Sequence, residues 1–171
     1  MKRAVTVVTF LLVLLSIIIS SCVFSSKKEL GHTLADYEKA VEKDLPEDLC
    51  LTIYYLSPGI LTRVPLGWES LKNHSETKKI IVESEKLETY VELLRKLNQS
   101  ILQPTEGESC INARLYYVFE TENDKLLEVD LTRISGTVFV NGIEVEDHPI
   151  FYELIAPFLT EDAYNTLGIH R

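Results

Sequence analysis

The densest group of side chains that could bind a metal ion follows the pair Asn141-Gly142 and comprises Glu144, Glu146, Asp147 and His148. Alternate residues of a β-strand point to the same side, so the first two carboxylates would lie together. Several oxygen ligands in one place suit Ca²⁺. The same residues also fit a solvent-exposed strand that leads into a helix cap, and we adopt this second interpretation. The sequence therefore predicts no metal site.

No motif of an enzyme or a cofactor site accompanies this group. The short motifs that present a catalytic serine or cysteine to a base are missing. The seven glycines are scattered singly, and the four histidines lack zinc-binding spacing. The 26 acidic residues could include a catalytic pair, but their number alone does not indicate one. We predict no cofactor and no enzymatic activity. The alternative is an envelope hydrolase that uses carboxylates or a serine against peptide, ester or cell-wall sugar.

Aromatic residues are the best candidates for a binding groove. Tyr54, Trp68 and Tyr116 could line a surface for a peptide or a sugar. Neighbouring residues of a strand face opposite sides of its sheet, so one tyrosine of each adjacent pair, Tyr54-Tyr55 and Tyr116-Tyr117, is expected in the core. The other tyrosine of each pair either lines the groove or only packs across strands.

Cys50 and Cys110 lie in the body of the chain and could form a disulfide if the protein folds outside the cytoplasm. Closing a loop of about 60 residues would stabilise the fold by roughly 4 kcal/mol in the chain-entropy model. The alternative is a pair of buried free thiols. We predict the bridge.

The elements that would position these side chains follow from periodicity and turn residues. The clearest helix is predicted to begin at Ser84, because apolar residues then recur at spacings of three and four. These residues are Leu87, Tyr90, Val91, Leu94 and Leu97. The pair Asn141-Gly142 is typical of a two-residue β-hairpin.

The remaining segments alternate between strand and helix patterns. Further helices are predicted over 34–45, 68–71, 149–158 and 161–167, and strands over 51–56, 60–64, 79–83, 113–120, 126–131, 137–140 and 143–146. Ser57-Pro58-Gly59 would turn the first strand into the second. The sum predicts an α+β domain: a mostly antiparallel sheet of five to seven strands with two or three helices packed on one face.

The N-terminus has the layout of an export signal. Lys2 and Arg3 precede an apolar run over 4–19, and Ile19-Ser20-Ser21-Cys22 resembles the lipobox of bacterial lipoproteins. The resemblance implies that 1–21 is a signal peptide and that Cys22 is acylated. We expect 22–31 to be a spacer, and the length of 32–171 is that of a single domain. An uncleaved membrane anchor is the alternative, because the apolar run is near the shortest that spans a bilayer. Both interpretations place the domain outside the cytoplasm.

The net charge limits the partners. Without residues 1–21 the chain has 15 Lys and Arg against 26 Asp and Glu, a net charge of −11. A surface of this sign is repelled by phosphate backbones and anionic headgroups, so nucleic acid is not an expected partner. The lipid on Cys22, and not a basic patch, would hold the protein to the membrane.

A second resemblance covers about residues 78–158. The order of strand, helix and hairpin-linked strands, with the stretch Val138-Phe139-Val140-Asn141-Gly142, is similar to small uncharacterised α+β domains of Gram-positive lipoproteins. Such families imply a fold and a tether but no activity. The sequence therefore predicts a lipid-anchored protein on the extracytoplasmic face of the cell membrane. Its domain would be a non-enzymatic binding or assembly module for an envelope protein or a small ligand.

Overall fold

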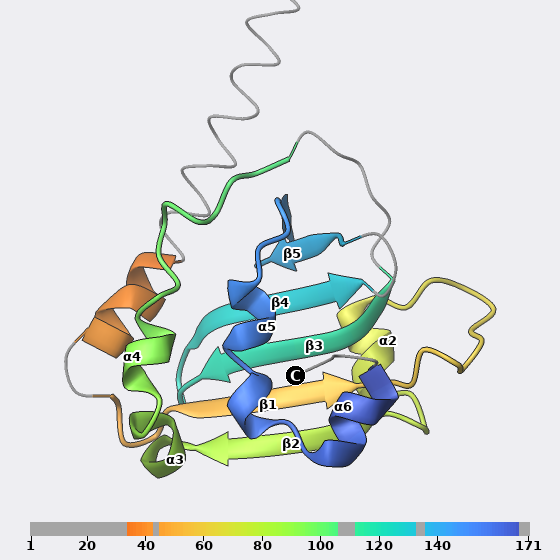
Figure 1. Ribbon diagram of the computed structural model, residues 1–171, viewed down its shortest axis with the longest axis horizontal. Helices are drawn as coiled ribbons and strands as arrows, with labels where there is room; N and C mark the ends of the chain where they lie inside the picture. Colours follow the sequence, from red (N-terminus) through yellow and green to blue (C-terminus); the bar gives the residue numbers. More distant parts are fainter. Residues whose placement is uncertain (1–33, 43–44, 106–111, 133–135, 168–171) are drawn as a thin grey trace, which may run out of the picture.

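The computed structural model describes residues 34–42, 45–105, 112–132 and 136–167, and an antiparallel sheet of six strands forms its centre (Figure 1). The strands are β1 (Cys50–Tyr55), β2 (Lys78–Glu83), β3 (Ala113–Glu120), β4 (Lys125–Thr132), β5 (Val138–Val140) and β6 (Ile143–Val145). Their order across the sheet is β2-β1-β3-β4-β5-β6. The predicted fold class, α+β with a mostly antiparallel sheet, is confirmed.

β1 lies between two strands that follow it much later in the chain. Its register places Ile53 opposite Ile80 of β2 and opposite Tyr117 of β3. The predicted return strand over 60–64 is wrong. The turn does form, since Ile60 N donates to Ser57 O at 3.0 Å, but the chain then leaves the sheet and Leu61 is 94% exposed. Strands more distant in sequence bury β1 on both sides, which a local return strand could not do.

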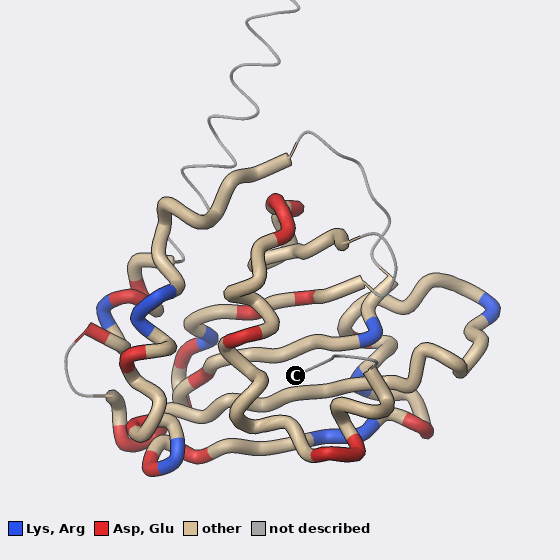
Figure 2. Tube along the Cα trace, in the orientation of Figure 1, with Lys and Arg blue, Asp and Glu red and all other residues tan. Residues whose placement is uncertain are grey.

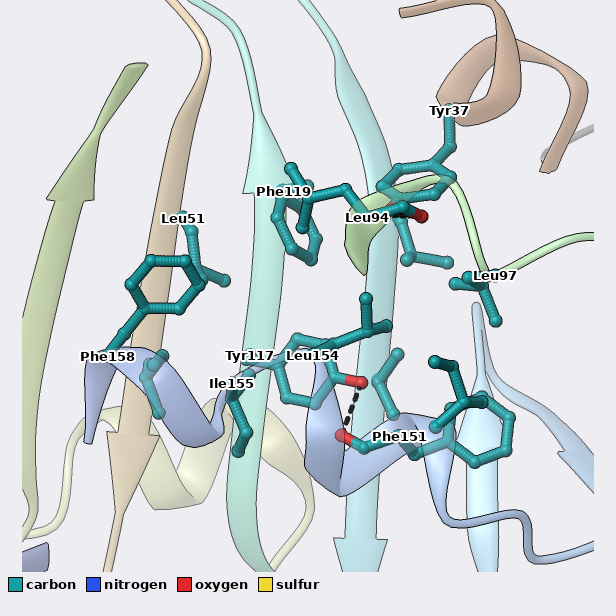
Figure 3. Close-up of a cluster of buried hydrophobic side chains, with 14 of the residues drawn as sticks. Tyr37, Leu51, Leu94, Leu97, Tyr117, Phe119, Phe151, Leu154, Ile155 and Phe158 are labelled. Atoms are coloured by element: carbon teal, nitrogen blue, oxygen red, sulfur yellow. Dashed lines mark hydrogen bonds between the residues drawn. The ribbon is translucent and has the colours of Figure 1, made fainter. Parts of the chain in front are cut away.

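Most of the helical segments cover one face of the sheet (Figure 1). They are residues 34–42, α3 (Ser84–Glu88), α4 (Val91–Leu94), α5 (Ile150–Glu153), the 3₁₀ turn η1 (Ala156–Phe158) and α6 (Glu161–Leu167). The apolar side chains that alternate along the strands point into this layer, and Figure 3 shows Tyr117 and Phe119 of β3 at its centre. The Tyr117 hydroxyl is satisfied there, because it donates to Phe151 O at 2.9 Å.

The helix predicted from Ser84 is broken in two. Tyr90, between α3 and α4, has φ −117° and ψ 16°, outside the helical region. Its ring packs edge-on against Phe158, with ring centroids 5.0 Å apart. Leu87 and Leu94 remain buried on either side of the break. The apolar stripe thus identified side chains that pack on the core, with Tyr90 and Val91 partly buried, while the helix is interrupted at Tyr90 where its ring meets Phe158.

One helix lies on the other face, which is a difference from the predicted arrangement. α2 (Trp68–Lys72) packs against a separate apolar cluster. That cluster consists of Leu56, Leu66, Leu71, Ala113, Tyr116 and Val118. We call this second face, which carries Tyr54 of β1, Tyr116 of β3 and Asp130 of β4, the open face.

The two edges of the sheet differ. The hairpin between β5 and β6 has positive φ at Asn141 (50°) and Gly142 (78°), as the predicted turn requires. The outer side of β6 is covered by 103–105, where Glu146 N donates to Gln103 O at 2.8 Å and Thr105 N donates to Glu144 O at 3.0 Å. β2 forms the opposite edge. No strand in the described ranges pairs with its outer side.

Candidate binding site

A row of polar and aromatic side chains crosses the open face. The register places Lys79 of β2 opposite Tyr54 of β1, Tyr54 opposite Tyr116 of β3, and Tyr116 opposite Asp130 of β4. Residues directly opposite one another in antiparallel strands project to the same side. The four side chains therefore form one line across the sheet.

The three aromatic residues predicted to line a groove are brought together. Trp68 of α2 stacks on Tyr116, with ring centroids 5.8 Å apart and an interplanar angle of 18°. Tyr54 lies on the other side, 6.0 Å from Tyr116 between centroids. Tyr55 and Tyr117 are buried in the helical layer, as predicted for one tyrosine of each pair. Tyr116 is fully buried, so only Tyr54 and Trp68 present part of their surface to a ligand.

The ammonium group of Lys72 sits over all three rings. Its Nζ is 4.6 Å from the ring centroid of Tyr116, 4.7 Å from that of Trp68 and 5.3 Å from that of Tyr54. Each such contact contributes about 0.5 to 2 kcal/mol, depending on how far it is desolvated. Burial lowers the pKa of Lys72, and the charge of Lys125 lowers it further.

Two more lysines approach the same rings from neighbouring strands. Lys79 Nζ is 5.3 Å from the ring centroid of Tyr54, and Lys125 Nζ is 4.9 Å from that of Trp68. We call the three aromatic residues with Lys72, Lys79 and Lys125 the lysine–aromatic cluster. The sequence analysis missed its lysines. The one local signal was the spacing of four between Trp68 and Lys72, which places both on one side of a helical turn.

Two carboxylates adjoin the cluster. Glu128 Oε2 accepts a hydrogen bond from the Tyr116 hydroxyl at 3.1 Å and lies 2.6 Å from Lys125 Nζ. Asp130 is only 2% exposed, and its Oδ1 has no hydrogen-bond partner. Burial raises the pKa of Asp130 to about 7, the charge of Glu128 adds to the rise, and Lys72 and Lys125 oppose it. The open face thus combines ring surfaces, ammonium donors and a buried carboxyl group whose pKa is raised to about 7.

Two hollows among the described residues lie away from the lysine–aromatic cluster. One of about 60 Å³ is lined in part by Arg114 and Tyr152. Another, of about 330 Å³, lies between residues 34–42 and the end of α4, and the residues that line it include Glu38 and Arg95. Neither contains Asp130, whose pKa is displaced towards neutrality.

The group after Asn141-Gly142 leads from β6 into α5. His148 Nδ1 accepts a hydrogen bond from Ile150 N at 3.2 Å at the start of α5. Glu146, Asp147 and His148 are exposed. Within the described ranges no three His, Cys, Asp or Glu side chains are grouped so that they could hold a metal ion.

The disulfide predicted between Cys50 and Cys110 is not formed at Cys50 in this structure. Cys50 carries a free thiol, with its Sγ 3.8 Å from Thr52 Oγ1, and Cys110 lies outside the described residues. Cys50 is opposite Glu120, at the far end of β3 from Ala113. That strand length is about 24 Å, whereas the chain from Ala113 back to position 110 can span at most about 11 Å. A bridge would therefore require a different register.

We expect Cys50 to remain a thiol in the native protein. Alkylation of unfolded, unreduced protein should modify Cys50 to the same extent as alkylation after reduction, as measured by peptide mass mapping. If a peptide pair joining Cys50 to Cys110 appeared only without reductant, the pairing of β1 with β3 described here would be contradicted.

Residues 1–33, including Cys22, lie outside the described part of the chain, so lipidation stays a prediction. Among the described helices, none has the length and apolar character needed to cross a bilayer. Comparison of the sequence and the structure with family models, curated proteins and solved structures finds no match.

Proposed function

We propose that this chain is a membrane-tethered extracytoplasmic lipoprotein, acylated at Cys22, whose α+β domain is a non-enzymatic binding or assembly module of the cell envelope. The open face is its binding surface. The observation that carries the proposal is the lysine–aromatic cluster, which gathers on this face and not in the main core.

The chemistry of the cluster defines the ligand it suits. The exposed parts of Tyr54 and Trp68 offer flat apolar surfaces, and the ammonium groups of Lys72, Lys79 and Lys125 offer donors to an anion. These cations are concentrated in a chain whose net charge is −9. An envelope component with an anionic group beside an apolar face would complement both features.

A purely structural role for the cluster would also be consistent with cation–π contacts, because Lys72 attaches α2 to the sheet. Substitution of exposed residues of the cluster distinguishes this structural role from a role in binding. Lys79 and Tyr54 can be changed without opening the main core, since both lie on the open face. Loss of binding at unchanged stability would therefore indicate a surface that engages a ligand.

Site-specific photo-cross-linking in intact expressing cells tests the proposal. A photoreactive residue in place of Lys79 is expected to give a discrete adduct with a component other than a second copy of this chain. Tyr54→Ala in the same chain should reduce the yield of that adduct at least about five-fold with little change in thermal stability. The same photoreactive residue at Lys96, an exposed lysine beside α4 on the helical side, is the matched control. Equal labelling from both positions would refute the open face as a binding surface.

Intact-mass spectrometry of the membrane fraction tests the tether separately. Wild-type protein is expected to lose residues 1–21 and to gain the mass of two or more acyl chains, whereas Cys22→Ala should gain none. A wild-type chain that keeps its N-terminus and carries no lipid would show that the segment is an ordinary anchor.

A further inference from the structure

The edge formed by β2 is unusually well suited to pairing with another strand. β2 has six residues, and its outer backbone groups face away from the sheet, whereas the outer side of β6 is covered by 103–105. Unpaired N–H and C=O groups along an edge are a template for a further strand. A hollow of about 560 Å³ lies beside this edge, and its lining includes Ile81, Glu83 and Lys86.

The side chains of β2 are arranged with opposite charges at its two ends. Lys78 and Lys79 open the strand and Glu83 ends it, and Figure 2 shows this edge strand blue where it begins and red where it ends. Lys79, Ile81 and Glu83 share the open face, because their partners on β1 are Tyr54, Thr52 and Cys50. Ile81, at the centre, is 56% exposed, as few large apolar side chains are in the part of the chain that the structure describes.

We propose that β2 pairs antiparallel with β2 of a second copy of this chain, about a two-fold axis through Ile81. In this register Ile81 lies opposite its own counterpart, and Lys79 of each copy lies opposite Glu83 of the other. Opposite residues of an antiparallel pair share a face, so the open faces of both copies stay on the same side. The contact is isologous, which closes the assembly at two chains.

Other registers lose this complementarity. A shift by one residue would turn the apolar residues of one copy to the wrong face of the sheet. A shift by two would place Lys79 opposite Ile81 and leave Glu83 opposite a residue outside the strand. A parallel arrangement would set lysine beside lysine, which is destabilising. Only pairing centred on Ile81 matches both charged ends and buries the exposed apolar side chain.

Lysines on an edge strand usually prevent association. Here Glu83, at the other end of β2, pairs with the lysine of an antiparallel copy, so the lysines do not prevent association with the same strand. They still oppose pairing with a strand that lacks complementary charges. The interface is short, so a weak dimer is expected. The inference concerns the strand edge and does not depend on what the open face binds.

Cysteine cross-linking of the full-length chain in membranes of expressing cells tests the two-fold axis directly. Ile81→Cys is expected to give a reducible covalent dimer under mild oxidation, because residue 81 meets itself across the axis. Leu61→Cys, at a 94% exposed position away from β2, is the control for random collision, and the parent chain controls for the natural cysteines. Dimer from both variants at equal rates, no dimer from Ile81→Cys, or an adduct with a different protein would each overturn the proposal.

A pair of variants checks the register. Lys79→Cys and Glu83→Cys chains expressed together should cross-link to each other, whereas Lys79→Cys alone should give little dimer, since the two copies of residue 79 are separated by about 13 Å along the strands. Equal cross-linking of the single and mixed samples would contradict an axis at Ile81.

Charge exchange gives a measurement without added cysteines. Lys79→Glu or Glu83→Lys alone is expected to raise the dissociation constant of the dimer about ten-fold, because two cross-strand ion pairs become repulsions. The double variant Lys79→Glu with Glu83→Lys should restore the wild-type value, as measured by sedimentation of the purified full-length protein in detergent. Lys96→Glu serves as the charge-matched control. Equal weakening by the single and double variants would overturn the proposed pairing.

Discussion

Asparagine in place of Asp130 is expected to stabilise the fold by up to about 4 kcal/mol at pH 8 and to change it little at pH 4. The pKa of this buried carboxyl is raised to about 7 in the folded state, from roughly 3.9 in an unfolded chain. Between these values the folded state binds more protons than the unfolded one, so stability is lost as the pH rises from 4 through 7. An amide avoids the cost of ionising a buried carboxyl group.

Denaturant unfolding of both proteins at pH 4.5 and pH 8 measures this effect. The two midpoints should be close at the lower pH and should diverge at the higher one. Asp124→Asn is a suitable control, because Asp124 is exposed in the turn between β3 and β4. Equal destabilisation by Asp130→Asn at both pH values would contradict this prediction. It would mean that the carboxylate stabilises the fold as a partner of Lys72 and Lys125.

Alanine in place of Phe119 is expected to cost roughly 3 to 5 kcal/mol of folding stability, which is the range for removing a fully buried aromatic ring. Phe119 is 0% exposed, and its ring centroid is 5.4 Å from that of Tyr37 and 6.1 Å from that of Tyr117 (Figure 3). The substitution would leave a cavity between β3 and residues 34–42. Urea unfolding monitored by circular dichroism measures the loss.

Leu61→Ala provides the comparison for this core substitution. Leu61 is 94% exposed, so removing its side chain should change stability by less than about 0.5 kcal/mol. A loss below about 1 kcal/mol for Phe119→Ala would mean that the core between β3 and residues 34–42 is not packed as described.

The strand faces could be predicted because strand alternation is a local property. The adjacent tyrosines of β1 and β3 were expected to face opposite sides of the sheet, and Tyr55 and Tyr117 are the members in the main core, while Tyr54 and Tyr116 lie on the open face. The predictions that were wrong concern segments whose structure depends on tertiary contacts. Residues 60–64 form no strand because β2 and β3 occupy both sides of β1, and the helix from Ser84 is interrupted where Tyr90 packs on Phe158.

The candidate site was predictable in its aromatic residues but not in its charges. The sequence indicates an aromatic surface because it contains Tyr54, Trp68 and Tyr116. Lys72 lies over all three rings because α2 crosses to the open face. The sequence pattern does not specify which face of the sheet a short helix covers. The raised pKa of Asp130 likewise depends on burial that only the assembled sheet provides.

The position of β1 between β2 and β3 imposes an order on folding. Among the described residues β1 has no partner upstream, and its pairing with β3 joins residues separated by more than sixty positions, such as Ile53 and Tyr117. Contacts so distant in sequence form slowly, because a long loop must close before they are gained. A growing chain that has not yet reached β3 cannot complete the centre of its sheet. The first half of the domain would therefore leave the apolar side of β1 and β2 without its central neighbour until β3 has been synthesised.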